Sequence, residues 1–386
     1  MSGKISIFDG YFGLERETLR VDESGRLAQS PHPFGDDEHI TRDFCENQIE
    51  IVTPVCRSIG EALDSLEELD SKVRRVLEQR GEHVWLYSNP PYFENEDEIP
   101  IADFSGADSH KTNYRLVLEK KYGKRLMLFS GIHFNFSFSE DLLDEWNTSG
   151  EEPRAFRDSL YLRLYKQLIV HSWLLVLMTA SSSYYDASLD EDGAAGVVKS
   201  IYSSVRNSDR GYWNSFIPIL DHSSIRAFAD SISSYVDRGE LFSASELYLP
   251  IRLKPRGENS LGNLARNGVD HIELRMFDLD PSAPLGIDGK NLEFAHAFMI
   301  YLLSLPDFEL TEQLQKKAVR YHREAALAEP AEGLIERGHD ILSAMREFFK
   351  EYPDTAELID SAEQRLDRIA AVGNYDDSVI FRQAVN

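Results

Sequence analysis

Polar and apolar side chains alternate along four segments of the chain, and this period of two predicts β-strands with two unlike faces. In the first segment, residues 12–21 ("FGLERETLRV"), Glu15 and Glu17 stand two positions apart and therefore point to the same face. Leu19 and Val21 continue that face. The strand thus gathers two anions on one side of a sheet.

Residues 126–139, 41–54 and 271–280 repeat this alternation. Their polar positions are, in order, His133, Asn135, Ser137 and Ser139; Glu46, Gln48 and Glu50; and Glu273 and Arg275. Each strand alone is compatible with a half-solvated sheet that turns its polar side chains to water. Four such strands, with enough helices elsewhere to cover one face of a sheet, favour instead a polar face that lines a cavity.

Helical periodicity is clearest in residues 57–81, where apolar residues recur every three or four positions and Ser58 is a candidate N-cap. Residues 154–180 are mostly apolar and predict one long, buried helix. Residues 181–211 are rich in Ser, Gly and Asp and predict loops. Long helices around a mixed or antiparallel sheet indicate an α+β fold.

Length and composition indicate a globular protein of 386 residues, 42% hydrophobic and 28% charged. We expect one domain over residues 1–386, with a helical C-terminal portion from about residue 291. The net charge, 41 minus 66 or −25, argues against nucleic acid and anionic membranes as partners. The start of the chain lacks the pattern of a signal peptide and the apolar run 168–180 is too short to span a bilayer, so we expect a cytoplasmic protein. Cys45 and Cys56 lack paired spacing, which argues against a disulfide framework or a cysteine zinc site.

The acidic positions on the predicted strands are the main candidates for chemistry. Glu15, Glu17, Glu50 and Glu273 would repel one another in a common cavity unless cations neutralised them. Ligation by oxygen atoms suits Mg²⁺ or Mn²⁺, and Mg²⁺ commonly joins carboxylates to nucleotide phosphates. His133 beside these carboxylates fits Mn²⁺ or a phosphate contact better than zinc. A hydrogen-bonded histidine of the core is the alternative.

Known phosphate-binding motifs are absent, because the sequence contains neither GxxxxGK[ST] nor GxGxxG. Phosphates would then need metals together with scattered cationic side chains. Arg252, Lys254 and Arg256 in "LPIRLKPRG", with Arg275, are the candidates, and a solvated basic patch is the alternative for the first three. The nucleophile elbow of serine hydrolases is also missing.

Seven blocks of the sequence resemble, in order, those of bacterial glutamate-cysteine ligase, the γ-glutamylcysteine synthetase of glutathione synthesis. The blocks are "FGLERETLRV", "ITRDFCENQIEIVTPV", "KTNYRLVLEKKYG", "SGIHFNFS", "SSVRNSDRGY", "LYLPIRLK" and "HIELRMFDLDP". The family belongs to the glutamine synthetase and guanidino kinase superfamily. The resemblance therefore implies a curved, mainly antiparallel sheet that forms a cavity and is covered by long helices.

The resemblance implies an ATP-dependent ligase as a single catalytic domain. Such enzymes phosphorylate the γ-carboxylate of L-glutamate with ATP and Mg²⁺ or Mn²⁺, and the amine of L-cysteine then displaces phosphate to give γ-glutamylcysteine. Small molecules would be the partners. The alternatives are a γ-glutamyl ligase for another amino-acid acceptor, and a phosphagen-type kinase, which would release a stable phosphorylated product.

The resemblance also assigns roles by position. The metal ligands would be Glu15, Glu17, Asp43, Glu50, Glu273 and His133, with His133 alternatively a phosphate contact. Arg275 would face the transferred phosphoryl group, and Arg252 and Lys254 would bind the nucleotide. The substrate contacts would be Arg206, Tyr212, Phe44, Tyr114, Arg115 and Tyr248, of which Arg206 and Tyr212 lie in "RNSDRGY" and the other four would form the acceptor pocket. Core packing is the alternative for the aromatic residues.

Two departures from the family pattern concern loops near the predicted site. "TASSSYYDAS" stands where a Gly-Ala-Ser-Pro turn is usual, and Ser282 stands where an aromatic residue is usual. The chain is also shorter than the long bacterial enzymes. The residues predicted to bind metal and phosphate are all present, so the resemblance supports the chemistry more strongly than the acceptor.

Overall fold

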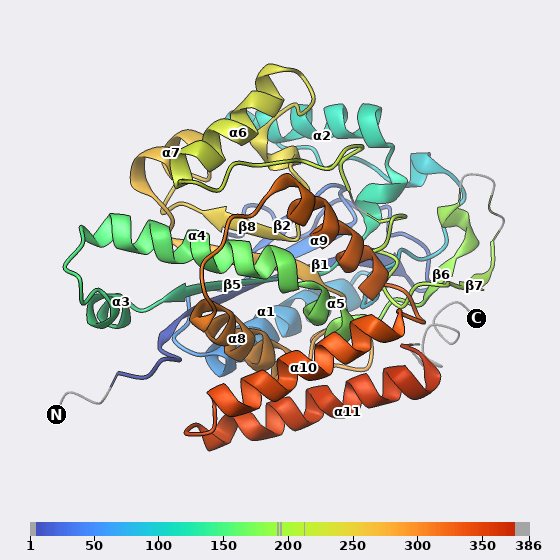
Figure 1. Ribbon diagram of the computed structural model, residues 1–386. Coiled ribbons are helices and arrows are strands. Elements are labelled where there is room, and N and C mark those ends of the chain that lie inside the picture. The colour runs from blue at the N-terminus through green and yellow to red at the C-terminus, as the bar shows by residue number, and fades with distance from the viewer. Residues whose placement is uncertain (1–4, 191–192, 194, 212, 375–386) are drawn as a thin grey trace.

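One seven-stranded antiparallel sheet forms the centre of the protein (Figure 1). The structure is a computed structural model that describes residues 5–190, 193, 195–211 and 213–374. The strands run in the order β2-β3-β1-β5-β9-β8, and β4 also pairs with β1. Their bounds are β1 Gly10–Asp22, β2 Ile40–Arg42, β3 Gln48–Val52, β4 Glu82–Trp85, β5 Ile132–Phe138, β8 Ile251–Lys254 and β9 His271–Phe277. The α+β prediction is confirmed.

Helices α1, α4, α5 and α8 cover one face of the sheet, α10 and α11 lie beyond them, and α2 lies over the other face (Figure 1). The helices are α1 Ile59–Glu78, α2 Ser109–Tyr122, α3 Glu140–Trp146, α4 Pro153–His171, α5 Trp173–Thr179, α6 Ile225–Asp237, α7 Leu261–Asn267, α8 Gly289–Ser304, α9 Glu312–Ala325, α10 Glu332–Phe348 and α11 Ala356–Val372. A small second sheet pairs β6 (Tyr184–Asp186) with β7 (Val197–Lys199). Among the described residues, those from Gly289 onward form mainly helices, α8 to α11.

Three predicted elements differ in extent from the observed ones. Residues 41–54 form two strands rather than one, because β2 and β3 pair with each other across an intervening turn. Residues 126–139 begin with a short 3₁₀-helix, so β5 starts only at Ile132. The predicted helix over 154–180 is interrupted at Ser172, which closes α4 and precedes α5. Apolar runs of this kind carry no signal for such breaks.

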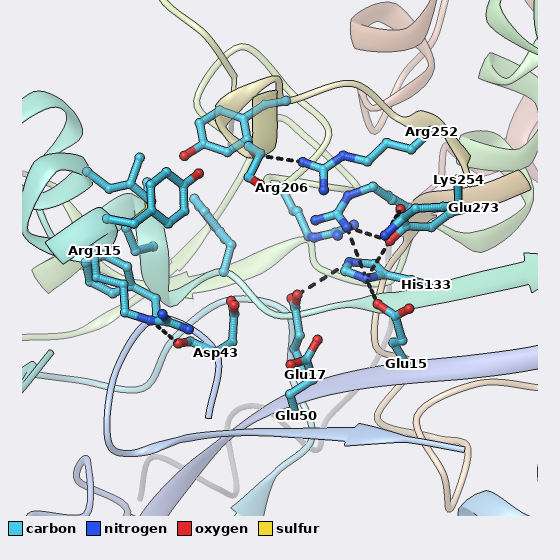
Figure 2. A pocket seen from close by; sticks show the side chains of 18 residues that line it. Glu15, Glu17, Asp43, Glu50, Arg115, His133, Arg206, Arg252, Lys254 and Glu273 are labelled. Carbon is cyan, nitrogen blue, oxygen red and sulfur yellow. Dashed lines mark hydrogen bonds and ion pairs between the residues drawn. The ribbon is translucent and has the colours of Figure 1, made fainter. Parts of the chain in front are cut away.

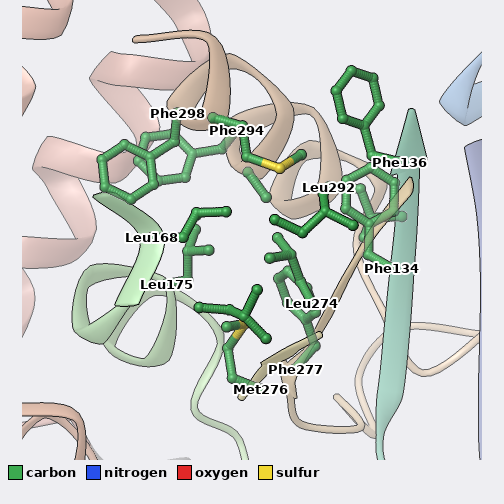
Figure 3. Close-up of a cluster of buried hydrophobic side chains, with 14 of the residues drawn as sticks. Phe134, Phe136, Leu168, Leu175, Leu274, Met276, Phe277, Leu292, Phe294 and Phe298 are labelled. Atoms are coloured by element: carbon green, nitrogen blue, oxygen red, sulfur yellow. The ribbon is translucent and has the colours of Figure 1, made fainter. Parts of the chain in front are cut away.

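The main hydrophobic core fills the space between the sheet and the helices. Phe134 and Phe136 of β5 and Leu274 and Met276 of β9 meet Leu168 and the α8 side chains there (Figure 3). Phe277 also lies in this core, although strict alternation would place it on the polar face with Glu273 and Arg275. The alternation of β9 therefore ends at Arg275. The alternation of β5 and most of β9 thus separates an apolar face from a polar one.

The helix-facing side of β1 also buries two arginines. Arg16 forms an ion pair with Asp70 of α1, and Arg20 lies 2.5 Å from Glu82 of β4. Both guanidinium groups are inaccessible to water. These ion pairs were not predictable from the strand pattern, because alternation places Arg16 and Arg20 on the apolar face without showing a partner. On the opposite face, which they share with Glu15 and Glu17 as predicted, Leu19 and Val21 belong to a smaller hydrophobic core.

Candidate active site

A cavity of about 220 Å³ lies over the polar face of the central strands (Figure 2). Its lining residues are Glu15, Glu17, Asp43, Phe44, Glu50, Tyr114, Arg115, Leu118, Met127, Phe129, His133, Arg206, Ser245, Tyr248, Arg252, Lys254, Glu273 and Arg275. Every described residue to which the family resemblance assigned a role is in this set. Tyr212 lies outside the described residues.

The register of the sheet explains why the acidic residues meet. Glu17 of β1 is paired with Glu50 of β3, and Glu15 is paired with His133 of β5. On the next strand, Glu273 of β9 is paired with Asn135 of β5. Paired residues of neighbouring antiparallel strands project to the same face. Four adjacent strands therefore place these side chains in one row across the floor of the cavity.

His133 is at the centre of this row and is almost fully buried. Its Nδ1 lies 3.0 Å from Oε2 of Glu15 and 3.4 Å from Oε1 of Glu273, and its Nε2 lies 3.4 Å from Oε1 of Glu17. Asn135 Nδ2 donates to Oε1 of Glu15 at 2.9 Å. His133 is thus buried and hydrogen-bonded, as the alternative of a core histidine also requires, but its polar neighbours are three carboxylates of the cavity lining.

Two carboxyl groups at the other side of the row have raised pKa values. Burial, together with the charges of Asp43, Glu15 and Glu17, raises the pKa of Glu50 well above its ordinary value. Burial also raises the pKa of Glu17. Without a cation, these two groups tend to keep a proton, because a second ionised carboxylate would lie in a desolvated position beside the first.

Glu273 has the opposite shift. Burial alone would raise its pKa, but the Arg275 and Lys254 cations outweigh burial and hold this pKa well below its ordinary value. Nη1 of Arg275 lies 2.7 Å from Oε1 of Glu273, and Nζ of Lys254 lies 3.2 Å from Oε2. Figure 2 shows Lys254 and Glu273 on the same side of the cavity. The cavity therefore has an anionic floor and a cationic wall beside it.

The donor atoms fit a divalent cation. Glu15, His133 and Glu273 each offer one ligand atom, and these atoms lie within 4.8 Å of one another. Glu17, Glu50 and Asp43 add further carboxylate oxygens on the same cavity lining. An oxygen-rich set with one imidazole suits Mg²⁺ or Mn²⁺. A bound cation would favour the ionised forms of Glu17 and Glu50, whose pKa values burial raises.

Arg206 reaches the cavity from a loop that a buried carboxylate organises. Asp278 accepts hydrogen bonds from Ser182 Oγ at 2.7 Å and from Ser204 Oγ at 2.9 Å. Gly131, just before β5, lets the Arg206 guanidinium approach the backbone, because a Cβ at this position would come within 2.5 Å of Arg206 Cζ. The glycine of "SGIHFNFS" thus has a steric role that the sequence pattern did not indicate.

Aromatic and apolar side chains form the other end of the cavity. Phe44, Tyr114 and Tyr248 lie there, and Arg115 of α2 donates to the backbone oxygen of Asp43 at 2.5 Å. Sequence reasoning missed four lining residues, which are Leu118, Met127, Phe129 and Ser245. Leu118 is three residues from Arg115 on the same helix, so helical spacing from the predicted residues could have identified it.

Several polar strand positions do not reach the cavity. Glu46 pairs with Arg42 at 2.6 Å, and Gln48 accepts from the backbone nitrogen of Phe44 at 3.2 Å. Arg256 is largely exposed and pairs with Asp270 at 2.8 Å and Glu140 at 3.3 Å. The solvated basic patch, which was the alternative for three residues, is therefore correct for Arg256 and wrong for Arg252 and Lys254.

Comparisons with known proteins agree on one family. Residues 3–240 and 236–324 match the family described as glutamate-cysteine ligase. The glutathione biosynthesis bifunctional protein GshAB of Listeria welshimeri is 39% identical over 339 residues, which cover 83% of this chain and 43% of that protein. The GshAB protein of Clostridium perfringens is 37% identical over 364 residues, which cover 87% of this chain and 46% of that protein. This chain thus spans less than half the length of these relatives.

Two solved structures share the fold. A glutamate–cysteine ligase from Francisella tularensis, in complex with AMP, superposes with a TM-score of 0.83 at 24% identity and covers 97% of this chain and 84% of that chain. A bifunctional glutathione synthetase from Pasteurella multocida gives a TM-score of 0.82 at 25% identity, covering 98% of this chain and 50% of that chain.

Among the described residues, no helix combines the length and the apolar character that crossing a membrane requires.

Proposed function

This chain belongs to the glutamate-cysteine ligase family, and on this premise we propose that it joins the γ-carboxylate of L-glutamate to the amine of L-cysteine at the expense of ATP. The reaction would pass through γ-glutamyl phosphate and release ADP and phosphate. We further propose that residues 1–386 act as a single catalytic unit in the cytoplasm, where ATP and free amino acids are available.

One observation carries the proposal: the floor of carboxylates around His133 lies directly beside the cations Lys254 and Arg275 in the same cavity. A reaction between a carboxylate and a triphosphate brings many negative charges together. Such a reaction needs metal ligands and cationic side chains within one desolvated site. The row of acidic residues would supply the metal ligands, and the adjacent cationic wall would supply the cationic side chains.

The metal ligands would come from the floor of the cavity. We assign this role to Glu15, Glu17, Asp43, Glu50, His133 and Glu273, with Mg²⁺ or Mn²⁺ as the cation. When bound, the metal would neutralise phosphate charge and orient ATP and the attacking carboxylate. Arg275 would stabilise charge on the transferred phosphoryl group, and Glu273 would hold Arg275 in position through their 2.7 Å contact.

The nucleotide would enter from the side of Arg252 and Lys254. A second cavity of about 60 Å³ shares Ser245, Arg252 and Lys254 with the first and is otherwise largely apolar. It lies beside β8, the last strand in the order of the sheet. We assign the nucleotide phosphates to Arg252 and Lys254, which line both cavities.

The proposed ligation consists of two displacement reactions. A γ-carboxylate oxygen of glutamate attacks the γ-phosphorus of ATP, and ADP leaves. The amine of the acceptor then attacks the γ-carbonyl carbon, loses a proton, and displaces phosphate, which carries away the carboxylate oxygen that formed the acyl phosphate. Arg206 would bind a carboxylate of a substrate through its two-pronged guanidinium group, with Tyr212 as a further contact in the same loop.

The acceptor would occupy the aromatic end of the cavity. Phe44, Tyr114 and Tyr248, with Met127 and Leu118 beside them, enclose a small and mainly apolar space, and Arg115 lies next to it. Such a pocket suits a thiol-sized side chain and excludes larger ones by steric clash. It separates cysteine from a similar small apolar side chain by only about 1 to 3 kcal/mol.

The test is to incubate the protein with ATP, Mg²⁺, L-glutamate and a panel of amino acids and to identify the products by mass. The proposal predicts γ-glutamylcysteine as the main product. A γ-glutamyl product with another amino acid alone would reassign the acceptor, and a stable phosphorylated amino acid would indicate a kinase. The absence of any γ-glutamyl product would overturn the proposal.

A further inference from the structure

A fully buried carboxylate that does not line the cavity connects two of its walls. Glu246 lies in a short 3₁₀-helix, Ala244–Glu246, between the cavity-lining residues Ser245 and Tyr248. Its side chain is inaccessible to water. A buried carboxylate is costly unless several donors surround it, so its contacts indicate what the fold gains from its presence.

Donors from two separate segments reach this carboxylate. Lys121 of α2 forms an ion pair with Oε1, and Tyr122 OH, from the same helix, donates to Oε1 at 2.6 Å. The backbone nitrogen of Phe242 donates to Oε2 at 2.5 Å. The Lys121 ammonium group also donates to the backbone oxygen of Glu240 at 2.6 Å. The C-terminal end of α2 is thus fixed to the segment 240–248.

Helix α2 depends on such polar contacts because it has little apolar surface to bury. Over its fully described length it buries only Leu118. The middle of α2 is held by a second polar contact, because Arg115 donates to the Asp43 backbone oxygen at 2.5 Å. In most helices an apolar face sets the position relative to the core. In α2, the contacts of the Glu246 carboxylate with Lys121 and Tyr122 help to fix the position of the C-terminal end of the helix.

The same contacts set the distance between the two aromatic walls. The rings of Tyr122 and Tyr248 meet edge to face with their centroids 5.6 Å apart. At the outer side, Phe242 stacks on Tyr114 with centroids 6.2 Å apart. Asn214 completes the arrangement, since its Nδ2 donates to the Glu246 backbone oxygen at 2.7 Å and its Oδ1 accepts from the Tyr248 nitrogen at 2.9 Å.

We propose that Glu246 is a positioning residue that clamps α2 to the segment 240–248 and thereby sets the width of the acceptor pocket between Tyr114 and Tyr248. This inference rests on the proposed function for the identity of the pocket. Glu246 touches no substrate and acts through the walls that it joins. Its loss lets α2 move away from Tyr248, which weakens acceptor binding and leaves the metal and phosphate residues in place.

The experiment compares Glu246→Ala, Glu246→Gln, Lys121→Met and the control Lys120→Met in the ligase assay, with the KM for L-cysteine and for ATP measured separately. Glu246→Ala should raise the KM for cysteine by about tenfold or more, as expected for the loss of hydrogen bonds to a charged group, and change the KM for ATP much less. Glu246→Gln keeps two acceptor contacts and should recover part of this loss. Lys121→Met should follow in the same direction, while exposed Lys120→Met stays within about twofold of the wild type.

A readout independent of activity separates this inference from the proposed function. Hydrogen exchange of the α2 amides should be faster in Glu246→Ala than in the wild type and unchanged in Lys120→Met. If the wild type makes no γ-glutamyl product, the proposed function fails and the exchange result alone decides the clamp. If Glu246→Ala does not fold, Lys121→Met and Tyr122→Phe decide it. Unchanged α2 exchange, or an equal rise in the KM for cysteine and for ATP, would overturn the inference.

Discussion

Nη1 of Arg275 lies 2.7 Å from Oε1 of Glu273, two residues earlier on β9, so one strand carries an anion of the cavity floor and a cation of its wall side by side. Lys254 of β8 contacts the other oxygen of the same carboxylate. These two cations keep Glu273 ionised although it is fully buried. The carboxylate thereby orients Arg275, and under the proposed function it would also serve as a metal ligand.

Replacement of a carboxylate of the floor should abolish most of the activity without unfolding the protein. We expect Glu273→Gln and Glu15→Gln each to lower ligase turnover by about a hundredfold or more, because the amide keeps the shape but removes a charge that would hold the metal. Product formation and a thermal melt measure the two effects. Glu140→Gln, on the exposed part of α3, is the control. Near-normal turnover in either variant would contradict the metal site.

Arg206 should matter mainly for binding an amino-acid substrate. Arg206→Ala removes a charged hydrogen-bonding group, so we expect the KM for an amino-acid substrate to rise by about ten- to a hundredfold with a smaller effect on the KM for ATP. Gly131→Ala should give a weaker change of the same kind, because the new Cβ would push the Arg206 guanidinium out of position. Substrate-saturation curves measure both variants. Unchanged curves for Arg206→Ala would be incompatible with its assigned role.

The aromatic end of the cavity should determine the acceptor. Tyr248→Ala and Phe44→Ala enlarge this end, so we expect the ratio of kcat/KM for a larger amine acceptor to that for cysteine to increase by about tenfold. The KM values for ATP and glutamate should change less than this ratio. A competition assay with cysteine and a larger amino acid measures the preference. Equal losses for all three substrates would count against the pocket assignment.

The sequence predicted the floor of the site well because strand alternation is a local property. Glu15 and Glu17, two positions apart, had to share a face, and the register then paired Glu17 with Glu50. Asp43 and Phe44 could not be placed from alternation, because they lie in the turn between β2 and β3 rather than in a strand. Only the resemblance identified them.

Contacts that depend on distant segments were not predictable from local pattern. Arg16 and Asp70 are 54 positions apart and meet only when α1 packs on β1. Glu246 reads as an ordinary acidic residue in "SASELYLP", and nothing nearby in the sequence shows that Lys121 and Tyr122 surround it. The break at Ser172 likewise depends on the packing of α4 and α5 and not on a residue that ends helices by itself.

The buried ion pair between Arg16 and Asp70 should be important for stability. Asp70→Ala leaves the Arg16 guanidinium buried without its carboxylate, so we expect the free energy of unfolding to fall by about 3 to 5 kcal/mol. Urea denaturation measures this change. Asp64→Ala, on the exposed side of the same helix, should change the free energy of unfolding by less than about 0.5 kcal/mol. Similar effects of the two substitutions would contradict a structural role for the pair.

His296 should make stability depend on pH. Burial lowers its pKa from 6.5 to about 3 in the folded protein, so between these values the unfolded chain binds a proton that the folded chain excludes. The free energy of unfolding therefore falls as the pH falls from about 6.5 toward 3, by about 1.4 kcal/mol per pH unit for this one group. Above about pH 6.5, His296 is neutral in the folded and the unfolded chain, so this loss of stability is absent.

His296→Leu removes the group that binds the proton and places an apolar side chain among the rings of Phe8, Phe12 and Phe136. We expect the variant to lose stability less steeply than the wild type between pH 6 and pH 4.5, by about 1.4 kcal/mol per pH unit. Denaturation at several pH values measures the two slopes, and the difference at pH 7.5 gives the effect of packing alone. Parallel curves would contradict a neutral, buried His296.

The fate of the γ-carboxylate oxygens of glutamate tests the central claim most directly. The protein is incubated with ATP, Mg²⁺, L-cysteine and L-glutamate labelled with ¹⁸O in the γ-carboxylate, and the products are weighed by mass spectrometry. We predict γ-glutamylcysteine in equal amount to ADP, with one ¹⁸O atom transferred to each phosphate released. Phosphate without ¹⁸O, or ADP released without a γ-glutamyl product, would contradict ligation through γ-glutamyl phosphate.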